Sequence, residues 1–124
     1  MRILVIGSAL RSQGFDQGAA GLTFIEEAKT APKYRLYSLE DQWAALVSVE
    51  HGGVSVAGEI VEVPDERWPE ILASEPPGVV PGPIELDDGR EVIAALGDFE
   101  YMENHAVEIT QFGSFAAYLA SQGS

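Results

Sequence analysis

The sequence predicts an α+β fold, a small mixed β-barrel with flanking helices. Short stretches of strand-favouring residues, separated by turn-forming residues, dominate the 124-residue chain. Two stretches alone show the apolar spacing of an amphipathic helix. Short strands with frequent turns favour a sheet that curls into a barrel and carries its helices outside. The length is near that of the commonest domains, so we expect residues 1–124 to form a single domain.

The N-terminal residues predict a buried strand followed by a long loop. Arg2–Ile6 is mostly apolar and ends at Gly7, as a buried strand does. Residues 7–21 are rich in Gly, Ser and Gln and show little periodicity, which indicates a loop. Long loops inside compact domains are usually functional or disordered, which directs attention to this segment.

Two hairpins are predicted next along the chain. The first joins Thr23–Ala28 to Tyr34–Leu39 through a turn at Ala31-Pro32. A proline cannot donate to a sheet ladder, so it belongs at a strand end. The second hairpin joins Ala44–Val49 to Val54–Val63 across the turn residues His51-Gly52-Gly53.

A helix is predicted after the second hairpin. Asp65 is a suitable N-cap, and Trp68, Ile71 and Leu72 then fall on one helical face. Pro69 must lie in the first turn, where its missing N–H costs nothing. The segment Glu75-Pro76-Pro77-Gly78 ends the helix.

The last third of the chain predicts one hairpin and one helix. Ile84–Leu86 pairs with Glu91–Leu96 across the turn Asp87–Arg90. Phe112, Phe115, Ala116 and Leu119 mark a C-terminal helix, for which Thr110 is a candidate N-cap. Asp98–Val107 is polar, and its pattern assigns it to no element.

The composition excludes several functions. A net charge of −13 argues against binding to nucleic acid and to anionic membrane surfaces. No apolar run approaches the ~20 residues of a membrane span. The chain has no cysteine, so disulfides, thiolate nucleophiles and cysteine-based zinc sites are excluded, and we expect a cytoplasmic protein.

Positive charge gathers near the N-terminus. Residues 1–35 carry five basic and three acidic side chains, whereas residues 36–124 carry only Arg67 and Arg90 against 17 acids. If the protein binds a small anion, the N-terminal third is therefore expected to supply the counter-charge. His51 and His105 are far apart and lack acids at ligand spacing, so we expect no metal or other cofactor.

Two segments could carry chemistry. Gly7, Ser8, Ala9, Leu10 and Arg11 follow the first strand, where small residues let backbone N–H groups point at a carboxylate or an oxyanion. The same residue types are also common at an ordinary strand end. Glu75 ends an amphipathic helix, and apolar neighbours there would raise its pKa and suit it to acid/base catalysis. A solvated glutamate at a helix end is the alternative.

Four stretches of the chain resemble the C-terminal domain of allophanate hydrolase. GLTFIEEAKTAPKYRLYSLE is similar to a hairpin of that family, and LVIGSAL to its first strand and turn. The prolines of residues 76–83, followed by IELDDGREV, resemble its proline-rich turn and hairpin. EITQFGSFAAYLA is similar to the start of its last helix. The resemblance covers nearly the whole chain and implies the gamma-glutamylcyclotransferase-like fold.

The resemblance also implies a function. In that fold the loop matched by Gly7–Arg11 binds substrate through backbone groups, and Glu75 lies where an acid/base glutamate falls. The resemblance implies a stand-alone domain that acts on a small carboxylated urea or carbamate-type anion, as in decarboxylation of N-carboxycarbamate. A separate amidase subunit would be its partner.

Two other functions stay open. Ile6 stands where the wider fold has tyrosine, and Ala9 stands where the family has histidine. These departures motivate a non-catalytic accessory or metabolite-binding partner of a separate amidase. The third possibility is a gamma-glutamyl cyclotransferase, which would keep Glu75 as acid/base and release 5-oxoproline.

Overall fold

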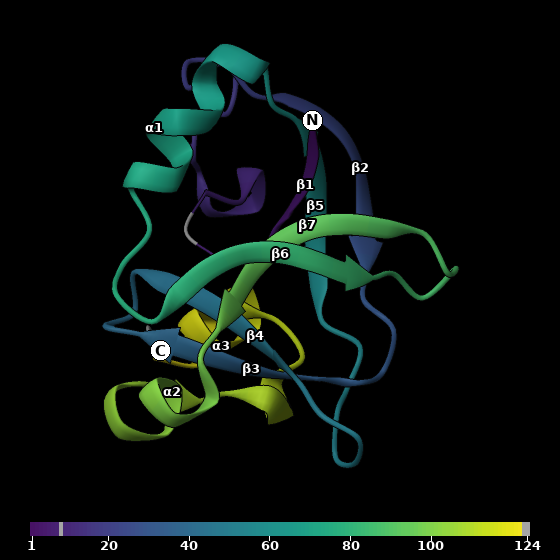
Figure 1. Ribbon diagram of the computed structural model, residues 1–124, viewed down its shortest axis with the longest axis vertical. Helices are drawn as coiled ribbons and strands as arrows, with labels where there is room; N and C mark the ends of the chain where they lie inside the picture. The colour runs from purple at the N-terminus through teal and green to yellow at the C-terminus, as the bar shows by residue number, and fades with distance from the viewer. Residues whose placement is uncertain (8, 123–124) are drawn as a thin grey trace.

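The computed structural model describes residues 1–7 and 9–122, and over these residues it has one eight-stranded mixed sheet and three α-helices (Figure 1). The predicted α+β class is confirmed. The strands are β1 Arg2–Val5, β2 Thr23–Lys29, β3 Tyr34–Leu39, β4 Trp43–Ser48, β5 Ala57–Glu62, β6 Val79–Glu85, β7 Glu91–Gly97 and β8 Val107–Glu108. The α-helices are α1 Trp68–Ala73, α2 Phe99–His105 and α3 Phe115–Gln122, and 3-10 turns cover Arg11–Gln13, Asp65–Arg67 and Thr110–Phe112.

Strand β7 joins the two halves of the sheet. The strand order is β2-β5-β1-β7-β4-β3-β8, with β6 paired along the other edge of β7. On the shared edge, Ile93 of β7 pairs in parallel with Ile3 of β1, and Leu96 pairs in parallel with Leu46 of β4. One long strand therefore links the β1–β5–β2 half to the β4–β3–β8 half.

The sheet curls but does not close into the expected barrel, because the described strands leave it open. The ends of β2 and β6 approach each other at the single bridge Thr30–Leu86, where the Ala31 N–H donates to the Glu85 carbonyl (2.9 Å). The backbone N–H and C=O groups of Glu85 therefore point away from β7. Pro81 and Pro83 lie four and two positions before Glu85 in the same strand, so their backbone groups point away from β7 as well. Two proline rings thus replace the outward N–H groups that a longer ladder with β2 would need.

The predicted hairpin across Ala31-Pro32 is also wrong. Strand β2 pairs with β5, from Thr23–Glu62 to Lys29–Ala57, and β3 pairs with β4 and β8. The chain turns a corner between the two halves of the sheet instead of folding back on itself. Thr30 anchors this corner from the inside, since its buried hydroxyl accepts the Val56 N–H (2.9 Å).

The hairpin predicted across His51-Gly52-Gly53 is likewise absent from the described strand pairs. This loop instead folds over the end of β3, where the Val54 N–H donates to the Tyr34 carbonyl (2.9 Å). Gly53 is required by that close approach, because a Cβ there would lie 2.5 Å from the Lys33 carbonyl carbon. A glycine pair that suggested a hairpin turn therefore serves a close backbone contact.

The structure has a β6–β7 hairpin, which the sequence signals, and a β3–β4 hairpin, which it does not. The β6–β7 hairpin was predicted, although β6 begins five residues earlier than expected and contains Pro81 and Pro83. The β3–β4 hairpin turns at Glu40 and Asp41, which adopt positive φ angles of 55° and 57°. Glycine or asparagine normally signals such a turn, and neither is present.

The predicted helix after β5 is confirmed as α1, but its start differs. Asp65 opens a 3-10 turn and its side chain caps nothing, so its predicted N-cap role is wrong. Pro69 lies in the first turn of α1, as expected. The helix ends before Glu75, at the position that the sequence predicted.

The unassigned segment 98–107 contains α2. Its N-cap is Asp98, whose carboxylate accepts the Tyr101 N–H (2.9 Å). The predicted C-terminal helix is confirmed as α3, but Thr110 does not cap it. The Thr110 hydroxyl accepts the Leu36 N–H (3.1 Å) and thereby fastens the C-terminal segment to β3.

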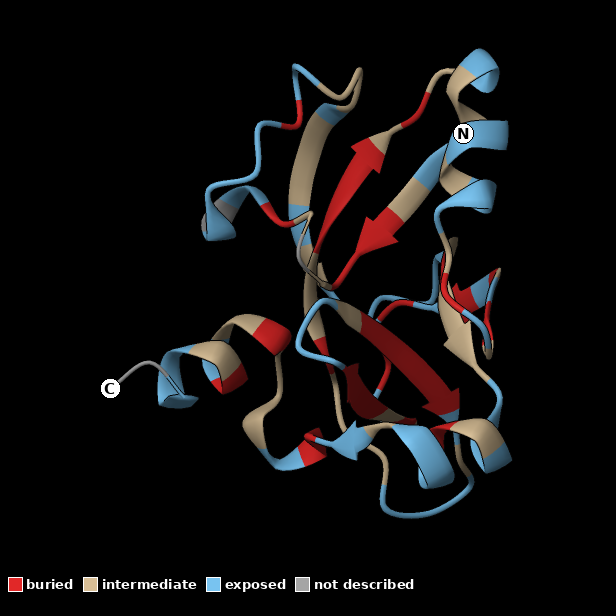
Figure 2. Ribbon diagram, turned by 90° about the vertical axis from the view of Figure 1, so that its left-hand side faces the viewer, coloured by how far each residue is buried: buried red, intermediate tan, exposed pale blue. Residues whose placement is uncertain are grey.

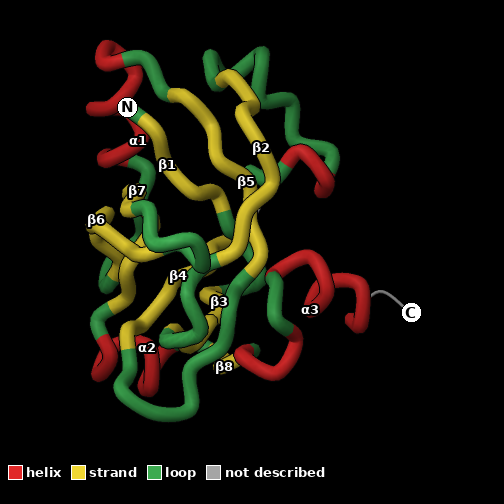
Figure 3. The backbone as a smooth tube through the Cα atoms, turned by 90° about the vertical axis from the view of Figure 1, so that its right-hand side faces the viewer, coloured by secondary structure: helices red, strands yellow, loops and turns green. Residues whose placement is uncertain are grey.

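Helices pack on both sides of the sheet. Figure 3 shows α1 and α3 on opposite sides of the molecule. Phe115 of α3 is fully buried in the main core cluster, while Trp68 and Ile71 of α1 pack against a smaller cluster that includes Val61 and Leu10. Buried residues line the inner strands of both halves (Figure 2).

Candidate functional site

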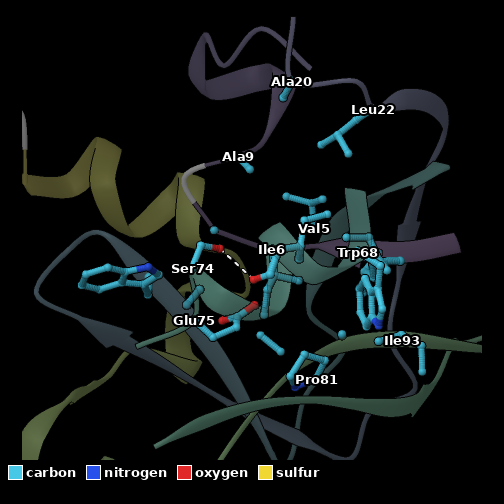
Figure 4. Close-up of a pocket in the computed structure, with 18 of the residues that line it drawn as sticks. Val5, Ile6, Ala9, Ala20, Leu22, Trp68, Ser74, Glu75, Pro81 and Ile93 are labelled. Atoms are coloured by element: carbon cyan, nitrogen blue, oxygen red, sulfur yellow. Dashed lines mark hydrogen bonds between the residues drawn. The ribbon is translucent and has the colours of Figure 1, made fainter. Parts of the chain in front are cut away.

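A cavity of about 340 Å³ lies beneath α1 (Figure 4). Its floor comes from β1, β4, β6 and β7, and its rim comes from α1 and the loops after β1. Most of the lining side chains are apolar, among them Trp43, Trp68, Ile71 and Ile93. The cavity is therefore large enough for a small molecule and offers it mainly apolar walls.

Glu75 contributes a carboxyl group to this cavity. It follows α1 directly, and the Ser74 hydroxyl secures the end of the helix by donating to the Ile71 carbonyl (2.8 Å). Figure 4 shows the Glu75 side chain among the lining residues, together with Ile6 and Pro81. Among the described residues, none donates a hydrogen bond to its carboxylate.

Burial raises the pKa of the Glu75 carboxyl, because removal of water disfavours the charged form. A carboxyl group with a raised pKa exists in both acid and base forms nearer to neutral pH. Such a group can give a proton to a reacting atom or take one from it. Glu75 is therefore the group in this cavity best suited to proton transfer.

The structure brings part of the Gly7–Arg11 segment to the same cavity. Gly7 and Ala9 line it with Glu75, and Gly7 packs so closely that a Cβ would lie 3.2 Å from the Ala44 nitrogen. Ser8 lies outside the described residues. The loop and the carboxyl group thus border one space, although 68 positions separate Gly7 from Glu75.

Leu10 and Arg11 lie elsewhere. The Leu10 side chain is 3% exposed and packs in the core beside Val61. The Arg11 guanidinium stacks on the Phe24 ring, 3.6 Å from its centroid. Neither residue is among those that line the cavity. Their backbone N–H groups donate within the protein, that of Leu10 to the Gly7 carbonyl and that of Arg11 to the Glu59 carboxylate, so their part in binding substrate stays a prediction.

Arg67 is the cationic residue that sequence reasoning missed. The described lining of the cavity includes no other Lys or Arg, and in particular none of the five basic residues from the N-terminal third. Its guanidinium pairs with Glu70 (3.0 Å) on the rim. Arg67 is one of only two basic residues after position 35, and that rarity was the available signal.

The remaining candidates for chemistry do not assemble. His105 stacks on Tyr101, with ring centroids 4.3 Å apart. Over the described part of the chain, no three His, Asp or Glu side chains are grouped so that they could hold a metal ion. Within residues 1–7 and 9–122 no helix is long and apolar enough to cross a membrane.

The raised pKa of Glu75 predicts a pH-dependent effect on stability. A native state that binds this proton more tightly than the unfolded chain is stabilised below the ordinary glutamate pKa. That contribution is lost as the pH rises through the raised value. We therefore expect Glu75→Gln to be more stable than the wild type at about pH 7, with the difference shrinking towards about pH 4.

Urea denaturation at a series of pH values measures this effect. The same change at the exposed Glu66 controls for the loss of one negative charge. Parallel stability curves for the Glu75→Gln variant and the wild type would show that burial does not raise this pKa.

Comparison with known proteins gives consistent matches. A model of the allophanate hydrolase C-terminal domain matches residues 1–120. Over 103 residues, 78% of the chain, the sequence is 28% identical to the urea amidolyase of Lachancea kluyveri, and the match spans only 6% of that protein.

Solved structures with a similar fold include two that bear on the family. A uropathogenic Escherichia coli-specific protein superposes with a TM-score of 0.85 at 33% identity, covering 96% of this chain and 94% of that one. The allophanate hydrolase of Kluyveromyces lactis superposes with a TM-score of 0.83 at 27% identity. That match covers 97% of this chain but 21% of the hydrolase.

Proposed function

This chain belongs to the allophanate hydrolase C-terminal domain family, and on that premise we propose that it performs acid/base chemistry on a small carboxylated urea or carbamate anion. The proposed reaction is the decarboxylation of N-carboxycarbamate. The observation that supports it most is that Glu75, with its raised pKa, shares one cavity with Gly7 and Ala9. The family resemblance inferred from the sequence is confirmed; the reaction is a proposal.

The proposed reaction needs one proton at one nitrogen. The bond between this nitrogen and one carboxyl carbon breaks, its electron pair moves to the nitrogen, and carbon dioxide leaves. Glu75 in its acid form donates a proton to that nitrogen, which yields carbamate, and then regains a proton from water. Backbone N–H groups of the Gly7 loop would hold the carboxylate that stays.

The apolar walls of the cavity favour the same reaction. The side chains of Ile71 and Ile93 offer no polar group to a departing carboxylate, so a charged carboxylate is less well solvated against them than in water. Carbon dioxide is neutral, so the apolar environment does not destabilise it. Arg67 is the lining cation that could attract the anionic substrate towards the rim.

An amidase would supply the substrate. The related segment of the L. kluyveri urea amidolyase is a small part of a much longer protein. We therefore propose that this domain works with an amidase, in the same or in a separate chain, which produces N-carboxycarbamate.

The test is release of carbon dioxide from N-carboxycarbamate formed in situ by an amidase acting on allophanate. We expect this protein to raise the rate above that of the amidase alone, in proportion to its concentration. An unchanged rate would overturn the proposal. In that case, co-purification with the amidase would assign an accessory role, and 5-oxoproline from a gamma-glutamyl dipeptide would assign a cyclotransferase.

A further inference from the structure

A buried polar pair lies behind the Gly7–Arg11 loop. Gln17 is 5% exposed and Glu59 is 3% exposed, and the Gln17 Nε2 donates to the Glu59 Oε1 (3.0 Å). Burial of a glutamate is costly unless hydrogen bonds compensate for the lost water. The proton-transfer chemistry proposed for Glu75 gives this pair no role.

The pair binds the loop at two points. The Gln17 Nε2 also donates to the Ala9 carbonyl (3.1 Å), and the Glu59 Oε1 also accepts the Arg11 N–H (2.7 Å). The Leu10 N–H, between these two points, donates to the Gly7 carbonyl (3.2 Å). The backbone on both sides of Leu10, at Ala9 and at Arg11, is therefore held by hydrogen bonds to the buried side chains of Gln17 and Glu59.

Both partners are themselves held by rigid parts of the fold. Glu59 lies within β5, paired with Val5 of β1 on one side and with Glu27 of β2 on the other. The Gln17 carbonyl accepts the Leu22 N–H (2.8 Å), which fixes its own loop just before β2. The position of the Gly7 loop is thereby set relative to the sheet that forms the cavity floor.

We propose that Gln17 and Glu59 are positioning residues that hold Gly7 and Ala9 at the cavity, facing Glu75. This inference rests on the proposed function, because it assigns the loop to the substrate. Neither residue is among those lining the cavity, so both act through the loop. An ordered loop presents its backbone N–H groups at a fixed place, and small errors in such placement lower rates strongly.

The orientation of the Gln17 amide makes the proposal testable. Its nitrogen faces two acceptors, the Ala9 carbonyl and the Glu59 carboxylate, while its Oε1 is buried without a partner among the described residues. A glutamate at position 17 has the same shape, but it would place a carboxylate oxygen, which accepts hydrogen bonds, against the Ala9 carbonyl and the Glu59 carboxylate. At position 59, by contrast, a glutamine keeps an Oε1 that accepts from both Gln17 and Arg11.

The experiment compares Gln17→Glu with Glu59→Gln in the full chain. We expect Gln17→Glu to lower kcat/KM for carbon dioxide release by about 10- to 100-fold and to speed hydrogen exchange at the Arg11 N–H. Glu59→Gln should stay close to the wild type in both. If Gln17→Glu does not fold, Gln17→Met removes the donor without adding a charge.

Binding of malonate supplies a readout that needs no turnover. Malonate replaces the N–H of N-carboxycarbamate with a methylene, and its affinity should fall in the Gln17 variants but not in Glu59→Gln. Wild-type kcat/KM and wild-type Arg11 exchange in Gln17→Glu would overturn the proposal, as would an inactive Glu59→Gln with an intact loop. If the wild type shows no turnover, the proposed function fails, and Arg11 exchange alone decides whether the pair holds the loop.

Discussion

Glu75→Gln is expected to lower kcat for carbon dioxide release by about 10²- to 10⁴-fold, because a glutamine cannot give or take the proton. The change preserves the shape of the side chain, so the cavity and the affinity for malonate should survive. In the wild type, activity should fall as the pH rises through the raised pKa of Glu75, since the acid form is the proton donor. The loss and the pH profile together identify a proton-transfer role.

Glu70→Gln is the matched control for this experiment. Glu70 also lines the cavity and lies in α1, but its carboxylate is exposed and paired with Arg67. An exposed ion pair contributes little, so this variant should keep nearly full kcat. Full turnover in Glu75→Gln, or an equal loss in both variants, would contradict a role for Glu75 as the acid.

The second large effect is expected from Phe115→Ala, which should lower the free energy of unfolding by about 3–5 kcal/mol. Phe115 is fully buried in the main core cluster, and its ring lies 6.4 Å from that of Tyr118. Its removal leaves a cavity where α3 packs on the sheet. Because domains are typically stable by about 5–15 kcal/mol, the variant should lose a large share of its stability.

Phe99→Ala controls for the chemistry of this substitution. Phe99 is 50% exposed in the first turn of α2, so its truncation removes little buried surface. Urea denaturation of both variants measures the difference. Similar losses would mean that α3 is not packed on the core as the structure has it.

Local sequence patterns located most strands but, apart from the β6–β7 hairpin, not their partners. Tyr34–Leu39 was predicted with the bounds that β3 has, yet β3 pairs with β4 rather than with β2. The β3–β4 turn was hidden because Glu40 and Asp41 adopt positive φ without a glycine. Asp41 is held by a contact that no local pattern reports, since its carboxylate accepts the Tyr118 hydroxyl hydrogen (2.9 Å).

For the candidate site too, the sequence indicated some of the residues and only the fold revealed the others. Glu75 and the Gly7 segment were singled out from the sequence, and the fold brings them to one cavity. Gln17 lies in a loop without periodicity, and Glu59 follows Gly58 in a strand where an acidic residue suggests a solvent-facing position. Their hydrogen bond links residues 42 positions apart, which only the folded chain reveals.

By itself, the sequence determined the family, the α+β class and the places of most elements, because side-chain periodicity and turn residues act within a few positions. Only the tertiary structure decided how the strands other than β6 and β7 pair and where the sheet stays open. Pairing depends on which backbone N–H groups of a strand point towards a neighbouring strand. The register with strands that are distant in the sequence decides which groups these are. Pro81 and Pro83 were visible in the sequence, but their effect on the edge of β6 appears only once β7 sets that register.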